Sequence, residues 1–174
     1  MELDSLFQEG SDLLRQGRLE ESEKLFVKIL ALNPEHLEAL NKMGVVCATR
    51  KNFPKAEEYF QKVLAVEPSH VPALTNLGSV FLEYGNIKEA EEYYRKALGY
   101  DPDYGPAHNN MGSIYKKRGD FSKMVQSLKK ARRAGYLTLE GPEKIRSFFL
   151  NPGCLVFLII ALLAILLNFL LGGK

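Results

Sequence analysis

A repeat with a period of 34 residues constrains this chain more than any other feature of the sequence. Four series share the spacing: Gly10, Gly44, Gly78 and Gly112; Pro34, Pro68 and Pro102; Phe26, Phe60, Tyr94 and Leu128; and Ser22, Ala56, Ala90 and Met124. A period of this length is typical of a supersecondary unit stacked several times, because one unit cannot bury its apolar face alone. The chain is therefore predicted to form a solenoid.

Each unit is predicted to contain two helices. In residues 71–104, apolar or small residues recur at helical spacing in two stripes, first Leu74, Leu77, Gly78 and Phe81, then Ala90, Tyr93, Tyr94 and Ala97. The turn signal Gly85-Asn86 separates the stripes, and Asp101-Pro102 ends the second one. The full pattern predicts helices over residues 3–16, 20–32, 37–50, 54–66, 71–84, 88–100, 105–118 and 122–134.

The small residues predict a close approach of the two helices within a unit. Glycine inside a helix costs about 1 kcal/mol relative to alanine, so it is expected where a larger side chain would push the helices apart. Gly78 and Ala90 are predicted to face each other at such a point. Phe81 and Tyr94 would fill the wider gaps beside them.

The pattern resembles the tetratricopeptide repeat family, whose repeat carries Leu-Gly, an aromatic residue, Ala, an aromatic residue and Pro. The third unit carries it as Leu77-Gly78, Phe81, Ala90, Tyr94 and Pro102, and the first and fourth units follow it less closely. The resemblance covers about residues 3–136. It implies an all-α, right-handed solenoid of four helix pairs (3–36, 37–70, 71–104 and 105–138), with the first helix of each pair lining a concave groove.

The resemblance also implies which residues line this groove and bind a protein or peptide partner. They are Asn41, Lys42, Thr75, Asn76, Ser79, Asn109, Asn110, Ser113 and Lys117, with Phe7, Ser11 and Val45 beside them. An Asn amide both donates and accepts, so a row of Asn can hold a peptide backbone, or it is only a solvated surface. Some family members grip a C-terminal carboxylate with Lys, Asn and Arg side chains. The matching first-repeat positions here are Phe7 and Ser11, or Asn41 and Val45 one repeat along, and neither pair offers a cation, so this activity is not predicted.

No motif for catalysis, metal or cofactor binding is recognised. His36 and His70 are 34 residues apart, which is expected of a repeat and not of a metal pair. The acidic pairs Glu57-Glu58 and Glu91-Glu92 are interpreted as solvated helix faces. An enzyme is therefore not predicted, and the acidic balance of most of the solenoid argues against nucleic acid as a partner.

Positive charge is concentrated towards the C-terminal end. Residues 1–112 hold 12 Lys/Arg and 18 Asp/Glu, whereas residues 113–150 hold 10 and 3. The basic block 116–146 either contacts anionic lipid headgroups or only orients the protein across a membrane. Within residues 137–153, Pro142 begins a short predicted helix with Ile145, Phe148 and Phe149 on one face. This helix lies on a bilayer or, as we favour, caps the uncovered edge of the last repeat.

Residues 154–171 are predicted to form one transmembrane helix. They carry no charge, and Asn168 is their one strongly polar residue. As a helix they would span about 27 Å, close to the thickness of the apolar part of a bilayer. The upstream Lys/Arg excess places the repeats in the cytosol and the C-terminus on the far side of a bacterial inner membrane or the endoplasmic reticulum.

Two features of the predicted transmembrane helix leave alternatives open. Ala161, Ala164 and Asn168 lie on one side of the helix and could contact a partner transmembrane helix. The alternative is that Asn168 has no partner, because a polar residue near the end of a transmembrane helix costs little free energy. Cys154 is either a palmitoylation site or inert.

The sequence thus predicts a tail-anchored, single-pass, non-enzymatic adaptor. It would bind a protein partner in the groove at the cytosolic face of a membrane. The alternative is a structural subunit or assembly factor of a membrane complex, which would pack through the solenoid surface and the transmembrane helix.

Overall fold

The computed structural model describes residues 2–136, which fold into eight α-helices. Their bounds are α1 Glu2–Arg15, α2 Leu19–Leu32, α3 Leu37–Thr49, α4 Phe53–Val66, α5 Val71–Glu83, α6 Ile87–Tyr100, α7 Gly105–Lys117 and α8 Phe121–Arg133. Each boundary lies within one residue of the predicted one. The prediction of four helix pairs is confirmed for this part of the chain.

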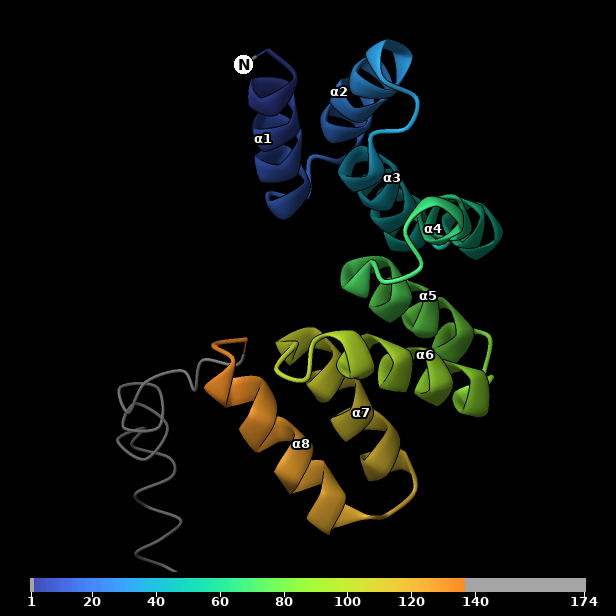
Figure 1. The fold of residues 1–174 in the computed structure, drawn as a ribbon, viewed down its shortest axis with the longest axis vertical. Coiled ribbons are helices and arrows are strands. Elements are labelled where there is room, and N and C mark those ends of the chain that lie inside the picture. Colours follow the sequence, from blue (N-terminus) through green and yellow to red (C-terminus); the bar gives the residue numbers. More distant parts are fainter. Residues whose placement is uncertain (1, 137–174) are drawn as a thin grey trace, which may run out of the picture. The chain divides into compact units, whose positions relative to one another are not determined.

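The helices stack in chain order. Each helix packs against its neighbours in sequence, so that the path runs from α1 to α8 as a succession of helix pairs (Figure 1). The first helices of the pairs also contact one another, in the order α1, α3, α5 and α7. The second helices α2, α4, α6 and α8 make no such mutual contacts within residues 2–136. The first helices therefore form the inner, concave row.

The close approach predicted inside a repeat is confirmed at Gly78. A Cβ atom at this position would lie 2.7 Å from Cε1 of Tyr94 and 3.1 Å from the carbonyl oxygen of Ala90. The Tyr94 side chain is fully buried, and Phe81 stacks on Tyr93 with ring centroids 5.3 Å apart. The Gly-Ala-aromatic pattern thus sets the distance between the two helices of a pair.

The repeat spacing also governs how helices begin and end. His36 and His70 precede α3 and α5, and their Nδ1 atoms accept hydrogen bonds from the backbone N–H of Ala39 and Ala73 at 3.3 and 3.1 Å. The two histidines therefore serve as helix N-caps. The turn inside each pair has a left-handed residue at the 34-residue spacing, namely Gly17, Lys51, Gly85 and Gly119.

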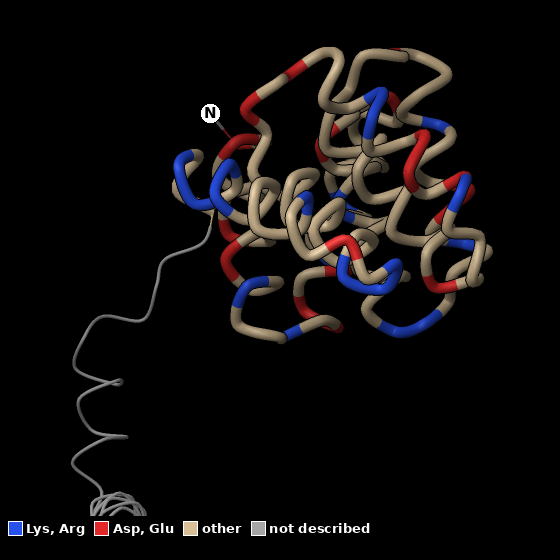
Figure 2. The backbone as a smooth tube through the Cα atoms, turned by 90° about the horizontal axis from the view of Figure 1, so that it is seen from below, with Lys and Arg blue, Asp and Glu red and all other residues tan. Residues whose placement is uncertain are grey.

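Charged residues cover the outside of the described chain. Lys and Arg positions are interspersed with Asp and Glu positions over most of it (Figure 2). No helix within residues 2–136 is long and apolar enough to cross a bilayer. The predicted segments 137–153 and 154–171, with the face Ala161, Ala164 and Asn168, lie outside the described residues.

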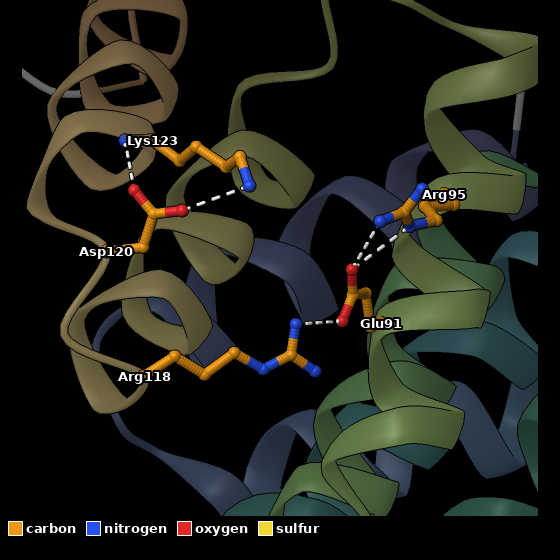
Figure 3. Close-up of polar contacts among 5 residues, drawn as sticks. All are labelled: Glu91, Arg95, Arg118, Asp120 and Lys123. Atoms are coloured by element: carbon orange, nitrogen blue, oxygen red, sulfur yellow. Dashed lines mark hydrogen bonds and ion pairs between the residues drawn. The ribbon is translucent and has the colours of Figure 1, made fainter.

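Glu91 corrects one expectation from the sequence. Its side chain is not on a solvated face but is only 11% exposed, in the joint between the third and fourth repeats. It accepts hydrogen bonds from Arg95 on the same helix and pairs with Arg118 at the end of α7, at 2.5 Å (Figure 3). Burial raises the pKa of Glu91, but the bonds from Arg95 and Arg118 outweigh it, so the pKa is lowered overall.

The same joint recurs between earlier repeats with different chemistry. Glu23 and Arg50, at the equivalent positions, pair at 2.6 Å between the first and second repeats. Between the second and third repeats the equivalent residues are Glu57 and Tyr84. There burial, followed by the charge of Glu57, raises the pKa of the Tyr84 hydroxyl. An acidic residue of one second helix thus meets the C-cap residue of the next first helix at every joint of the described chain.

Candidate functional site

Two side-chain hydrogen bonds link neighbouring repeats along the concave row. The Asn76 amide on α5 donates to Oδ1 of Asn41 on α3 at 3.1 Å. The Asn110 amide on α7 donates to Oγ of Ser79 on α5, also at 3.1 Å. The first helices of the second, third and fourth repeats are therefore joined by a ladder of polar side chains, which we call the amide ladder (Asn41, Asn76, Ser79 and Asn110).

The amide ladder is anchored from below by buried groups. Ser79 Oγ lies 3.1 Å from the hydroxyl of Tyr94 and 3.1 Å from the carbonyl oxygen of Thr75. Burial raises the pKa of Tyr94, and hydrogen bonds with Ser79 and Asn110 only partly oppose this, so the phenol stays protonated. Thr75 is only 3% exposed and donates its hydroxyl to the carbonyl of Val71. Thr75 therefore supports the groove floor rather than its surface.

The ladder leaves hydrogen-bonding capacity for a ligand. An Asn side chain has two N–H donors and a carbonyl oxygen with two lone pairs. Asn76 uses one donor, and no other described residue donates to its Oδ1 atom, whereas the Asn110 amide bonds both Ser79 and Tyr94. Asn109, half-buried one position before Asn110, has no side-chain partner among residues 2–136. The inner row thus presents oriented amides, and Asn76 and Asn109 keep hydrogen-bonding capacity for a ligand.

Two hollows flank the amide ladder. Hollow A, of about 370 Å³, lies between the second and third repeats and is lined by Val45, Ala48, Thr49, Lys51, Phe53, Phe60, Asn76, Ser79, Val80 and Glu83. Hollow B, of about 440 Å³, is lined by Phe7, Gln8, Ser11, Arg15, Glu38, Asn41, Lys42, His70, Pro72 and Tyr104. Hollow A is largely apolar with one cation and one anion at its rim, whereas hollow B combines aromatic and charged groups.

The structure brings most of the predicted groove residues together, but not all of them. Asn41 and Lys42 line hollow B, while Asn76 and Ser79 line hollow A. Ser113 and Lys117 lie exposed on α7 and line neither hollow. The groove is therefore best developed over the first three repeats.

Several lining residues were not anticipated from the sequence. Lys51 and Glu83 flank hollow A, and Tyr104 closes hollow B from the segment before α7. Lys51 could have been recognised from the sequence, because it replaces the glycine that the other three repeats carry at this position. Ser11 in hollow B has a buried hydroxyl without a hydrogen-bond partner among residues 2–136. An unpaired buried polar atom costs about 1–3 kcal/mol, which a bound ligand could recover.

The described residues show no cluster of side chains that could hold a metal ion. No group of three His, Cys, Asp or Glu side chains within residues 2–136 is placed to hold a metal ion. Cys47 is buried, and burial raises the pKa of its thiol, which disfavours the reactive thiolate. The inner surface offers hydrogen-bonding groups, apolar side chains and, at the two hollows, charged groups.

Comparisons with known proteins agree with the repeat architecture. Two family models described as tetratricopeptide repeat match the chain, one over residues 39–103 and one over residues 7–69 and 75–136. No sequence among the curated proteins matches it significantly.

Solved structures share the fold at low sequence identity. MamA 41-end from Desulfovibrio magneticus RS-1 is 23% identical, with a TM-score of 0.60, over 76% of this chain and 75% of that one. A crystal structure of MamA is 22% identical, with a TM-score of 0.60, over 76% of this chain and 78% of that one. A mutant of the Thermobaculum terrenum O-GlcNAc transferase is 24% identical, with a TM-score of 0.62, over 65% of this chain and 22% of the transferase.

Proposed function

Because this chain belongs to the tetratricopeptide repeat family, we propose that its concave row binds an extended segment of a protein partner. The observation that carries the proposal is the amide ladder, which joins three repeats through Asn76–Asn41 and Asn110–Ser79 hydrogen bonds. The ladder is formed before any ligand binds. Less conformational entropy is therefore lost on binding than with freely rotating side chains.

The chemistry of the ladder suits a peptide backbone. A backbone in extended conformation offers alternating N–H and C=O groups, and the Oδ1 atom of Asn76 and the side-chain amide of Asn109 can bond with them. The apolar part of hollow A, with Phe53 and Phe60, would take a hydrophobic side chain of the ligand. Lys51 and Glu83 at the rim of hollow A would repel a ligand segment that places a like charge beside either of them.

We further propose that the chain is held at a membrane by residues 154–171. The uncharged run is long enough to cross a bilayer, and the Lys/Arg excess upstream of it supports a cytosolic position for residues 2–136. The protein would then act without catalysis, as an adaptor that recruits its partner to a bacterial inner membrane or the endoplasmic reticulum. Ala161, Ala164 and Asn168 are the residues through which a partner transmembrane helix would dock.

Partner capture from native membranes tests the adaptor function. The full-length protein is cross-linked in the membrane, purified, and its bound proteins are identified by mass spectrometry. Changing Asn76, Asn109 and Asn110 to Ala is expected to remove the groove partner while the protein stays in the membrane fraction. Changing the exposed outer residues Gln61 and Ser122 to Ala, as a matched control, is expected to change nothing.

Two other outcomes would contradict the proposal. If the partner survives the Asn changes but is lost when Ala161 and Asn168 become Leu, the chain is a structural subunit that packs through its tail. If the unmodified protein is released from membranes by alkaline carbonate, the tether is wrong. Hydrogen exchange of α5 and α7 in the Asn variant checks that the groove helices remain folded.

A further inference from the structure

We propose that the outer face of α8 docks flat on an anionic membrane surface. This inference rests on the proposed membrane tether, and it adds the surface through which the repeats contact lipid. The face is formed by Phe121 and Val125 in the first half of α8 and by Lys129, Arg132 and Arg133 in the second half. We call these five residues the α8 face.

The geometry of α8 places these residues side by side. With 3.6 residues per turn, they fall within an arc of about 120°. Phe121 and Val125 are 63% and 44% exposed, although they are large apolar side chains. The opposite side of the helix, with Ser127 and Ala131, is buried against the rest of the repeat. The α8 face is thus an open, amphipathic surface, apolar at one end and basic at the other.

Comparison with the other repeats shows why the α8 face is open. The second helices α2, α4 and α6 each pack against the first helix of the next repeat, whereas α8 contacts only α7 among the described helices. Phe121 occupies the position of the half-buried Ile87, and Val125 the position of the buried Glu91. The α8 face is therefore the surface on which a fifth repeat would stack.

The residues on the α8 face are nevertheless unsuited to another repeat. The position of Arg132 is a half-buried leucine in all three earlier repeats, at Leu30, Leu64 and Leu98. The acidic residue of the joint, by contrast, has become Val125. A terminal repeat that only needs solubility would carry polar residues throughout. Loss of an acid, gain of a cation and retention of exposed apolar groups together match an interface that is negatively charged outside and apolar beneath, as in an anionic bilayer.

The charge around the α8 face supports the same partner. Residues 105–136 contain eight Lys/Arg and a single acidic residue, Asp120. Asp120 is already held by Lys123, through its N–H at 3.1 Å and its ammonium group at 3.0 Å. Lys129, Arg132 and Arg133 form no ion pair with any residue between 2 and 136. Their charge is thus available to lipid headgroups.

The tether brings this face within reach of the bilayer. The 17 residues of segment 137–153 separate the described chain from the apolar run, and fully extended they span at most about 60 Å. The helix itself is about 20 Å long. Confinement within this distance raises the effective concentration of the face near the headgroups, so a weak interaction is enough for docking.

A single tryptophan tests the proposal, because the chain contains no natural one. The full-length Phe121→Trp protein is reconstituted into phosphatidylcholine vesicles that contain brominated lipid, with or without phosphatidylserine. We expect quenching of the tryptophan emission when phosphatidylserine is present and loss of this quenching at high salt. Val27→Trp, at a 51% exposed position on α2, is the control and should not be quenched.

A charge series tests the basic half of the face. Changing Lys129, Arg132 and Arg133 to Gln in the Phe121→Trp background should shift the docking equilibrium by roughly a hundredfold, at about fivefold for each charge removed. Changing Lys24, Lys55 and Lys62 to Gln alters the net charge equally and should leave the quenching as it was.

Three results would overturn the inference. Equal quenching at positions 27 and 121 would show no specific docking. Blue-shifted emission without quenching would show that residues 142–150 or a second copy of the chain cover the face. Quenching that ignores phosphatidylserine and salt would remove the role of charge. Flotation of the vesicles at high salt reports tail insertion separately, so failure of the tether is distinguished from failure of the docking face.

Discussion

Replacing Glu91 by Gln is expected to loosen the joint between the third and fourth repeats. The Glu91 carboxylate is held by Arg95 and Arg118, and each hydrogen bond to a charged group is worth about 1.5–3 kcal/mol when it is well shielded. The Arg95 and Arg118 side chains are 65% and 42% exposed, so solvent screening reduces this value. We expect a loss of about 1–2 kcal/mol.

The loss should be confined to one part of the molecule. In a solenoid each repeat contacts only its neighbours, so a weakened joint promotes local opening of the terminal repeat. Hydrogen exchange of α7 and α8 in the full-length protein should therefore accelerate by roughly 5- to 30-fold. Exchange in α1–α4 should stay unchanged. Glu57→Gln is the matched control, because Glu57 meets Tyr84 rather than an arginine at the equivalent joint, and we expect at most about a twofold effect.

The difference in stability between the wild-type protein and the Glu91→Gln variant should depend on pH. Because the pKa of Glu91 is lowered from its ordinary value of 4.5 in the folded protein, its contribution is complete above that value. The contribution fades as the pH falls below 4.5 and through the folded pKa, where the native carboxylate becomes protonated. Wild type and Glu91→Gln should therefore converge in acid. A difference that persists there, or exchange that accelerates along the whole chain, would refute the role of the ion pair.

Two further predictions concern the backbone. Lys51→Gly should stabilise the protein by about 0.5–1 kcal/mol. Lys51 has a left-handed backbone with φ 61°, and the equivalent Gly85 has φ 82°. The strain that glycine relieves at this position exceeds the cost of its larger conformational entropy in the unfolded chain. Unchanged or lower stability in denaturant titrations would contradict this. Gly78→Ala should destabilise by about 1–2 kcal/mol, since crowding against Tyr94 outweighs the gain in helix propensity. Gly99→Ala, where no atom beyond the adjoining backbone of its own helix lies within 4 Å of the added Cβ, should instead stabilise by about 0.5–1 kcal/mol in the same titration.

The repeat architecture could be predicted because its causes are local. Each repeat of 34 residues contains the helical spacing of apolar residues, a turn residue that is usually glycine, and in most repeats a proline after the second helix. The same pattern therefore occurs several times in the chain. Gly78 and Tyr94 are likewise close in sequence, so their contact follows once the two helices of a pair are recognised. The groove residues came from the family resemblance, and the structure shows Thr75 as a buried support beneath them.

The joints between repeats could not be predicted in the same way. Glu91 and Glu92 are adjacent and chemically alike, yet Glu91 is buried and Glu92 is exposed. Which of them enters the joint depends on how the next repeat is rotated and on where Arg118 lies. Such contacts depend on the angle between neighbouring helix pairs. This angle cannot be predicted from the sequence pattern within one repeat.

The sequence by itself determined that this chain is a stack of four helix pairs followed by a charged, then apolar, C-terminal region. Tertiary structure alone decided that Asn76 meets Asn41, that Glu91 joins two repeats, and that Phe121 and Val125 are left exposed. The reason is physical. The periodicity of apolar residues in the sequence assigns each residue to a face of its own helix. Only the packing of neighbouring repeats decides whether that face contacts a hydrogen-bond partner, a cation or no other described residue.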